Sequence, residues 1–428
     1  MNNIKKSTFL ISTLILLIGG IFGKIIGFII KIIITRNLGV ESMGLYSLLS
    51  PTMSLLSTIA IFSYPTIISR IISNKKYRTK DLFSSIIPIS ILINSIMIII
   101  VILSSKFITT TLLKESSLYL PLICISLTMP FISISSIIKG FYWGKQNMFP
   151  YMLSNFIEQI TRIILILLFL NKIKNNIYKI CFIILISIIG ELVSQIIMYI
   201  YLPKIKIKNL NINTLIIKDT IPNSLRMTTS KLIGVFSHFL EPIILTNILL
   251  YVGYSKEYII YEYGIINAYA IPLLLMSQFF TQNMSTSLIP ELSSNYKINN
   301  KLCIKRIKQV CLISSLIGLS STIIITIYPK FFLNLLYKTK EGIDYIRLLS
   351  PFMLLFYIQF PLATAINAIG NTKDIIKITI VSSIIKIISI LILSLLKIGM
   401  YSLIISIIIN LIITTYMYYK ELNKLLIN

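Results

Sequence analysis

Two lysines lie in an otherwise apolar stretch, GGIFGKIIGFIIKIIITRN, at residues 19–37. Lys24 and Lys31 are seven residues apart, so in a helix both side chains leave the same face, about 10 Å apart along the axis. A charge at the centre of a bilayer costs at least about 2.5–3.5 kcal/mol, so such residues usually face a bundle interior or a wet cavity. The spacing therefore predicts a basic face that binds an anion.

Glycines share this face. Gly20 and Gly27 complete the series 20, 24, 27, 31, and Gly23 lies beside it. Glycines also serve close helix packing, but a lysine fits such packing only where its face meets a wet cleft. We therefore expect Lys24 to line a central cavity. For Lys31 two interpretations stay open, because a lysine near the outer interface also extends its ammonium towards the head groups.

A second polar segment lies in the span expected at 221–250. Lys231 and His238 are again seven residues apart, and Glu241 follows one turn after His238. Pro242 then interrupts the helical hydrogen bonding. A histidine beside a carboxylate within a membrane can relay protons. The alternative is a buried hydrogen bond that only holds helices together.

Three further spans carry ionisable side chains. Glu158 and Arg162 are four residues apart and predict an ion pair, whereas Glu191 is expected to be structural. Lys386 lies near the position that corresponds to Gln159 in a weak internal repeat. The spans hold more bases than acids, which favours an anionic substrate such as a phosphate or pyrophosphate. The candidate substrate-binding residues are Lys24, Lys31, Arg162, Lys231 and Lys386. The candidate proton- or cation-coupling residues are Glu158, His238 and Glu241.

These side chains require a scaffold of membrane helices. The 428-residue chain is 56% hydrophobic and 13% charged, with a mean hydropathy of +0.87, whereas a soluble chain has about 25% charged residues. The polar surface is too small for a soluble particle, which predicts an all-α integral membrane fold. The net charge of +26 lies mostly in short loops, where it sets topology and faces anionic lipids. We therefore expect membrane lipids, and no nucleic acid, as partners.

About 12 transmembrane helices of about 20 residues each are expected. Their approximate ranges are 8–34, 44–69, 82–104, 118–138, 150–170, 180–202, 221–250, 263–289, 309–328, 348–369, 375–396 and 399–419. Residues 154–170 resemble residues 381–396, and each stretch follows a short polar loop, GKQN or GNTK. The chain is therefore expected to form two six-helix halves of the same orientation, with substrate between them. The expected division is an N-terminal lobe at 1–203, a cytosolic linker at 204–220 and a C-terminal lobe at 221–428.

The loops and the N-terminus predict a multi-pass protein of the plasma membrane. Most loop lysines and arginines fall on one side, which places both termini in the cytosol. Lys5 and Lys6 precede an apolar run that is too long for a secretory signal and lacks a cleavage site, so we expect a retained first helix. The four cysteines match no zinc or redox motif.

Three blocks of the sequence carry family motifs. Residues 23–73 contain a lysine, a Gly-Phe pair, a second basic residue and an Arg-x-Leu-Gly-x-Glu-x-x-Gly-Leu-Tyr turn. KGFYWGKQNMFPYMLSNFIEQITR (139–162) and SHFLEPIIL (237–245) follow in the same order as in the family. Over most of its length the chain resembles the stage V sporulation protein B-like branch of the polysaccharide and lipid II flippase family. That family belongs to a superfamily which also includes the multidrug and toxin extrusion transporters.

The resemblance implies a V-shaped bundle that moves undecaprenyl-pyrophosphate-linked saccharides outward by alternating access. Lys24 matches the basic first-helix position that lines the cavity in related lipid II flippases. Lys31 stands where the family has arginine, which keeps the charge but loses bidentate phosphate geometry. Many relatives have fourteen helices, and the two that are missing here help to hold the lipid tail. The resemblance also implies the cell-wall synthesis machinery as a partner and spore cortex as a setting.

Three classes of function are compared. The first is a flippase without cofactors, driven by H⁺, Na⁺ or the membrane potential. The second is a cation-coupled small-molecule exporter of the multidrug type, with His238 and Glu241 as its coupling site. The third, a membrane glycan polymerase or transferase, is disfavoured, because we find no large outer loop, no acidic metal cluster and no Ser/His/Asp constellation. We therefore expect neither catalytic residues nor metal ligands.

Overall fold

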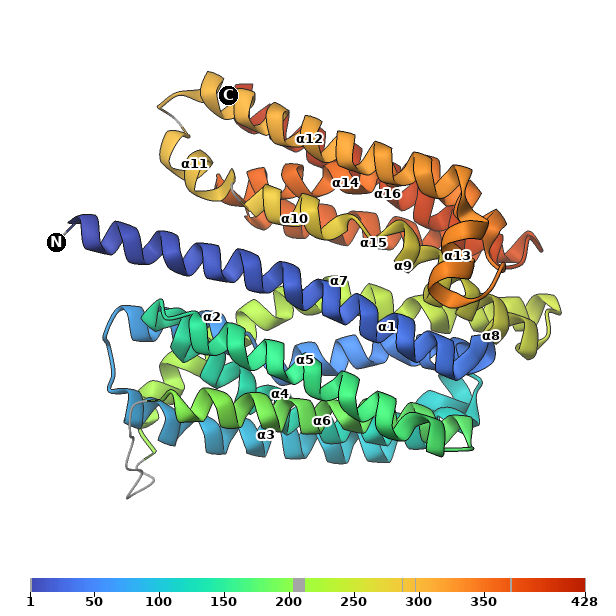
Figure 1. Cartoon of the computed structure of the whole chain (residues 1–428), viewed down its shortest axis with the longest axis horizontal. Coiled ribbons are helices and arrows are strands. Elements are labelled where there is room, and N and C mark those ends of the chain that lie inside the picture. Colours follow the sequence, from blue (N-terminus) through green and yellow to red (C-terminus); the bar gives the residue numbers. More distant parts are fainter. Residues whose placement is uncertain (1, 203–211, 287, 297, 370–371, 428) are drawn as a thin grey trace. The chain divides into compact units, whose positions relative to one another are not determined.

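A computed structural model describes residues 2–202, 212–286, 288–296, 298–369 and 372–427 (Figure 1). The elements of these ranges are helices. Ten of them are long and apolar enough to cross a membrane, and an eleventh span results if the bent pair Lys256–Leu274 and Gln278–Thr286, at 53°, counts as one. The described chain is therefore a multi-pass, all-α membrane protein, as its composition predicts.

The first helical stretch, α1 (Asn2–Ile61), is two helices joined at Gly39. Gly39 has φ 74° and ψ 173°, a backbone conformation that only glycine adopts without strain. The spans expected at 8–34 and 44–69 lie on the two sides of this break. Residues 22–73 nevertheless count as one span by length and composition, which explains most of the difference from the expected twelve.

Contacts between Cα atoms divide the chain into two compact units. Unit 1 consists of Met1–Leu38 and Leu49–Val235, and unit 2 consists of Gly39–Leu48 and Phe236–Asn428. Residues 203–211 of the expected linker lie outside the described residues, and residues 214–220 form the first turns of α7 (Thr214–Val252). The division into lobes at 203 and 221 stays a prediction.

Unit 1 is built around α4 (Tyr119–Lys145), which packs against α2 (Tyr64–Ser73), α3 (Thr79–Phe107) and α6 (Asn176–Ile200). α5 (Phe149–Phe169) packs against α6. The remaining elements of this unit are short: η1 (Ile108–Leu112), η2 (Ser116–Leu118) and η3 (Leu170–Lys172). Gly140 and Gly144 bring α4 onto α2, because a Cβ on them would lie 2.9 Å from Ile68 Cβ and 2.8 Å from Ser69 O. The helices therefore meet through small residues four apart, as in other membrane bundles.

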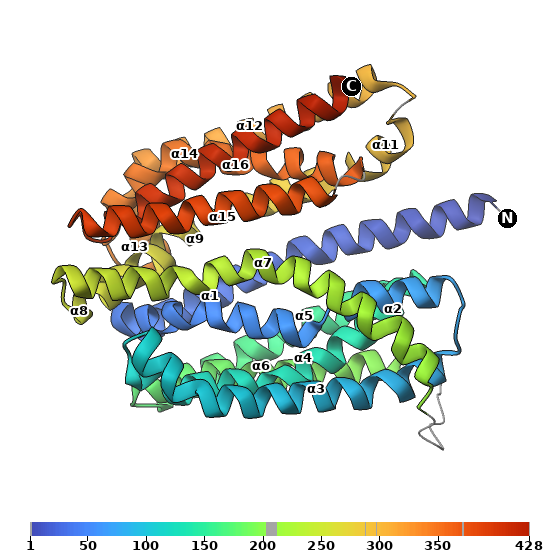
Figure 2. The same cartoon turned by 180° about the vertical axis from the view of Figure 1, so that it is seen from behind.

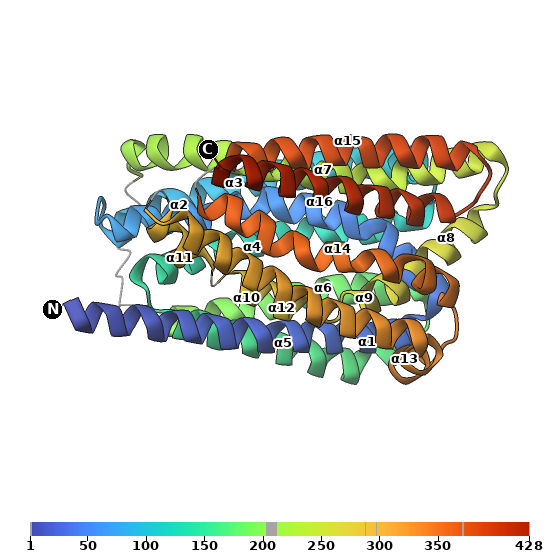
Figure 3. The ribbon, with the colours of Figure 1, turned by 90° about the horizontal axis from the view of Figure 1, so that it is seen from above.

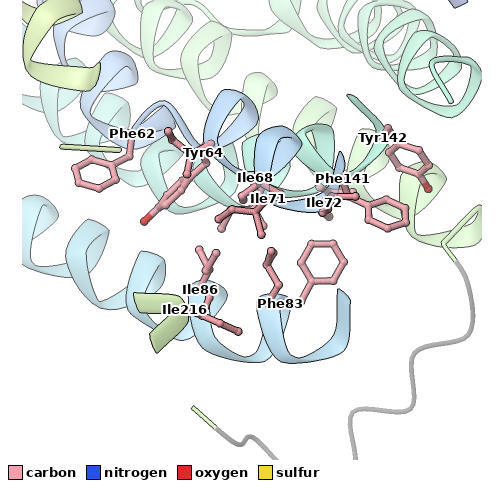
Figure 4. Close-up of a cluster of buried hydrophobic side chains, with 14 of the residues drawn as sticks. Phe62, Tyr64, Ile68, Ile71, Ile72, Phe83, Ile86, Phe141, Tyr142 and Ile216 are labelled. Carbon is pink, nitrogen blue, oxygen red and sulfur yellow. The ribbon is translucent and has the colours of Figure 1, made fainter. Parts of the chain in front are cut away.

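One cluster of buried hydrophobic side chains in unit 1 lies where α2, the start of α3 and the end of α4 meet. Figure 4 shows its large side chains from α2, α3 and α4, with Ile216 from the start of α7. The Tyr142 hydroxyl, on a side chain that is 1% exposed, donates to Met198 O at 2.5 Å. Thr228 Oγ1 of α7 lies 3.2 Å from Ser63 Oγ, at the start of α2. Ile216 and Thr228 therefore hold the first half of α7 to unit 1.

Unit 2 repeats this packing order around α14 (Ile343–Ala368), which packs against α12 (Asn300–Ile327) and α16 (Tyr401–Ile427), while α15 (Thr372–Leu395) packs against α16 (Figure 2). In the place of α2 are α10 (Gln278–Thr286) and α11 (Leu288–Asn295), which lie along α14 (Figure 3). The other elements are α8 (Lys256–Gly264), η4 (Ile265–Ala270), α9 (Ile271–Leu274) and α13 (Pro329–Tyr337). α5 and α15 thus hold corresponding places, in agreement with the repeat predicted from their sequences.

The short segment Gly39–Leu48 belongs to unit 2 through two glycines. A Cβ on Gly44 would lie 2.1 Å from Ile260 O of α8, and a Cβ on Gly264 would lie 2.9 Å from Gly44 Cα. Real Cβ atoms do not approach backbone so closely, so a side chain at either position would push the helices apart. The two backbones meet here because neither residue has a side chain.

Candidate functional site

The lysine face of α1 is separate from the face that packs on α5. A Cβ on Gly19 would lie 2.3 Å from Met152 Cγ, and a Cβ on Gly23 would lie 3.6 Å from Asn155 Nδ2. In contrast, a Cβ on Gly20 or Gly27 would meet no atom within 4 Å. Because each helical residue turns the chain by about 100°, the two faces are roughly a quarter turn apart. Helix packing therefore accounts for Gly19, but not for Gly20 and Gly27.

The two lysines of this face differ in exposure. Lys24 is exposed and Lys31 is half-buried. Both side chains have interaction partners in the structure, so neither is an isolated charge. A face of glycine and lysine that leaves room at Gly20 and Gly27 can admit an anionic group to the Lys24 ammonium. That role stays a prediction for Lys24 and Lys31.

Unit 1 holds a second group of charges on three helices. On α5, Arg162 Nη2 lies 2.8 Å from Glu158 Oε1, in the ion pair that their spacing predicts. The pair lies against α6, because a Cβ on Gly190 would be 2.9 Å from Arg162 Nε. Lys139 Nζ of α4 lies 3.9 Å from Glu191 Oε2 of α6. We call Lys139, Glu158, Arg162 and Glu191 the α4–α5–α6 charge cluster.

The charges of this cluster balance, with two bases and two acids. Glu158 is 4% exposed and Glu191 is 8% exposed, so ionised carboxylates there require their basic neighbours. Arg162 is accordingly engaged within unit 1, and its role in substrate binding stays a prediction. Sequence reasoning missed Lys139, because the span was expected at 118–138 and Lys139 falls just after it, whereas α4 continues to Lys145. The sequence signal that could have revealed it is its position six residues before Lys145, the last residue of α4.

Unit 2 joins Glu241, His238 and Lys386. The Lys386 ammonium of α15 donates to Glu241 Oε2 of α7. His238 Nδ1 lies 3.7 Å from the same oxygen. Glu241 is buried and Lys386 half-buried, whereas 68% of the His238 side chain is exposed. The group, which we call the Glu241 triad, therefore links a buried carboxylate to an accessible imidazole.

The sequence did not predict that Lys386 and Glu241 would meet. Lys386 was selected as a substrate ligand, and in this structure its ammonium is held by Glu241. An anion can reach that ammonium only if the pair opens. The ion pair of Lys386 and Glu241 joins two helices, α15 and α7. In unit 1, both members of the Glu158–Arg162 pair lie on α5.

Lys231 lies in the part of α7 that belongs to unit 1, and His238 lies in the part that belongs to unit 2. The Lys231 side chain is exposed, and its proposed contact with substrate stays a prediction. Among the described residues, no group of three or more His, Cys, Asp or Glu side chains could hold a metal ion. Within the same ranges Cys124, Cys181 and Cys303 are buried and Cys311 is partly exposed.

Comparisons with known proteins agree on the kind of protein. Residues 9–296 match the model of a family described as polysaccharide biosynthesis protein. Stage V sporulation protein B of Bacillus subtilis (strain 168) is 28% identical over 383 residues, which cover 85% of this chain and 74% of that protein. Sporulation protein YkvU of the same organism is 22% identical over 401 residues, covering 87% and 84%.

Solved structures share the fold at low identity. An inward-facing multidrug resistance MATE family transporter of the MOP superfamily has a TM-score of 0.75 and 14% identity, covering 94% of this chain and 95% of its own. A MOP superfamily transporter from Pyrococcus furiosus, described as having a binding pocket of reverse polarity, has a TM-score of 0.63 and 15% identity, covering 97% and 95%. These likenesses show a two-lobe transporter fold.

Proposed function

This chain belongs to the polysaccharide biosynthesis protein family, and we propose that it is a flippase for an undecaprenyl-pyrophosphate-linked saccharide. The cargo would be the peptidoglycan precursor lipid II or a related glycan lipid, and alternating access would carry its head group outward. No chemical bond changes in this process, so the protein is a transporter and not an enzyme. The names of the two Bacillus subtilis relatives support a role in sporulation.

The lysine face of α1 carries the proposal. Lys24 is exposed, and Gly20 and Gly27 leave room beside it. A pyrophosphate would gain charge-assisted hydrogen bonds from an ammonium there. Lys31, two turns further along α1, would meet the same head group or the outer interface, and Lys231 would add positive charge from α7.

The Glu241 triad is the proposed coupling site. Protonation of His238 or Glu241 would change the charge that faces Lys386, and an opened pair would offer the Lys386 ammonium to the substrate phosphate. The coupling ion would be H⁺ or Na⁺, with the membrane potential as a further source of energy. The protein would work in the plasma membrane beside the cell-wall synthesis machinery, with both termini in the cytosol.

Reconstitution in vesicles with fluorescent lipid II tests the proposal. Lys24→Glu should lower lipid II movement at least tenfold while membrane insertion stays normal. Lys174→Glu, which makes the same charge change in the exposed loop before α6, should leave the rate unchanged. Full movement by the Lys24→Glu protein would contradict the assignment of that site.

A cation-coupled small-molecule exporter is the second candidate, because His238 and Glu241 lie within 3.7 Å on one helix. An exporter of cationic drugs would be expected to carry free carboxylates in its spans, whereas Glu158 and Glu241 are both paired with bases. If vesicles moved no polyprenyl-pyrophosphate saccharide but expelled a cationic dye in response to a proton gradient, the exporter would replace the flippase.

A further inference from the structure

Unit 2 carries an apolar groove between α12, α14 and α16. Its volume is about 690 Å³, and one side is open. Most of the lining is aliphatic, with Leu355 and Ile412 at one end and Ile304 and Leu426 at the other. The helices that form it pack in the order α12, α14, α16, so every wall of the groove belongs to unit 2.

The length of the groove matches one leaflet of a bilayer. Ile412 and Leu426 both line it and are fourteen residues apart on α16, a distance of about 21 Å at 1.5 Å per residue. A bilayer is about 40–45 Å thick with its head groups, so one leaflet spans about 20–22 Å. An extended acyl chain with its phosphate therefore fits within the length of the groove.

Polar and basic side chains lie towards the Asn300 side of the groove, one turn inside Ile304 and Leu426. Lys308 of α12 and Asn423 of α16 line it. Four further exposed lysines flank it on the same two helices, at the start of α12 and the end of α16. They are Lys301, Lys305, Lys420 and Lys424. Each such base attracts an anionic lipid surface by about 1 kcal/mol.

Two tyrosines of α16 lie next to these polar side chains in the groove. Tyr416 and Tyr419 line the groove, and they are 62% and 57% exposed. Tyrosine collects where hydrocarbon meets head groups, because its ring is apolar and its hydroxyl is polar. From the Asn300 end, Lys308 and Asn423 come one turn after Ile304 and Leu426, and they are followed by the two tyrosines and then by Leu355 and Ile412, so a phosphate would lie one turn inside the groove.

We propose that this groove is a binding site for an anionic phospholipid of the leaflet at the Asn300 end of α12. One acyl chain lies along Ile358 and Ile412, and the phosphate meets the Lys308 ammonium. The zwitterionic lipids of the same leaflet fit the apolar part equally well, so selection comes from Lys308 and the lysines beside it. This site is independent of the lysine face on α1.

Cys311 provides a direct readout, because it lines the groove and is partly exposed, whereas the other three cysteines are buried. The full-length protein is placed in vesicles of phosphatidylcholine, with or without phosphatidylglycerol, and the rate at which a membrane-permeant maleimide modifies Cys311 is measured. Phosphatidylglycerol should slow the modification by protecting the groove. About 1 kcal/mol for one lysine corresponds to a roughly fivefold preference.

Matched variants separate the groove from general surface charge. Lys308→Glu should abolish the preference for phosphatidylglycerol, and Lys308→Arg should retain it. Lys305→Glu, one turn earlier and outside the lining, should keep most of it. Equal protection by both lipids, equal loss in the Lys305→Glu protein, or stronger protection by undecaprenyl phosphate than by phosphatidylglycerol would each overturn the proposal.

Discussion

The Lys386 ammonium on α15 pairs with the Glu241 carboxylate on α7, although the two residues are 145 positions apart in the chain. The corresponding pair in unit 1, Glu158 and Arg162, lies on the single helix α5. A pair on one helix stays closed when that helix moves as a rigid body. A pair across two helices closes or opens as they shift, so the Glu241 triad can respond to a conformational change and the α5 pair cannot.

Removing Lys386 should destabilise unit 2. Lys386→Met leaves the Glu241 carboxylate buried without its ammonium, and loss of one partner of a buried pair costs about 3–5 kcal/mol. His238 lies near the same oxygen, so we expect the lower end of that range. Thermal unfolding of the purified protein, followed by circular dichroism, measures the change.

Two comparison proteins complete this test. The exchanged pair Glu241→Lys with Lys386→Glu should recover most of the lost stability. Lys377→Met, an exposed position on the same helix, should change the melting temperature little. If the single variant and the Lys377→Met control unfolded alike, the pair would contribute nothing.

His238 should affect transport without affecting the fold. Its side chain is 68% exposed, so His238→Ala is expected to leave the melting temperature unchanged. If His238 delivers protons to Glu241, the variant should lose the acceleration that an imposed proton gradient gives to lipid II movement. An unchanged response to the gradient would show that His238 takes no part in coupling.

Lys139 should stabilise unit 1 through Glu191. Lys139→Met removes the base nearest to a carboxylate that is 8% exposed, and we expect a loss of about 2–3 kcal/mol, because the 3.9 Å contact is longer than a hydrogen bond. The double variant Lys139→Met with Glu191→Gln should regain most of this. Lys145→Met, on the exposed end of the same helix, is the control, and a loss as large in that protein would reject the pairing.

Leucine substitutions at two glycines should distinguish a helix face that is open from one that packs on another helix. Gly27→Leu places a side chain where no atom lies within 4 Å of a Cβ, so the protein should fold normally but move lipid II several-fold more slowly. Gly144→Leu drives a Cβ to 2.8 Å from Ser69 O and should destabilise unit 1 by about 1–3 kcal/mol. The Gly27→Leu protein should therefore lose transport rate but keep its melting temperature, whereas the Gly144→Leu protein should have a lower melting temperature. An equal loss of stability in both proteins would contradict an open face at Gly27.

Local patterns predicted much of this molecule. Hydropathy and length gave the membrane class and nearly all spans, and the four-residue spacing gave the Glu158–Arg162 pair. Gly39, within the Arg-x-Leu-Gly turn, ends one span and begins the next, as the ranges 8–34 and 44–69 required. Each of these features depends on residues that are close in the sequence.

Contacts between residues that are far apart in the chain could not be predicted from the sequence. Lys386 and Glu241 were each noticed, but nothing local indicates which charges meet across 145 residues. The contact between Lys139 and Glu191 was not predicted either, because these residues also lie on different helices, α4 and α6. Gly20 and Gly27 were assigned to the lysine face with Gly23 beside it, whereas the tight packing of Gly19 on α5 was not predicted, because only three-dimensional contacts distinguish the two faces.

The close contact of Gly44 with Gly264 has a consequence for biosynthesis. The two residues are 220 positions apart, and a ribosome adding about 5–20 residues per second reaches the second about 10–45 s after the first. During that interval the segment Gly39–Leu48 is in the membrane without the α8 backbone that it packs on. Unit 2 therefore contains a piece of chain that is made early, and this piece finds its packing partner only after the last residue of unit 1, Val235, has been made.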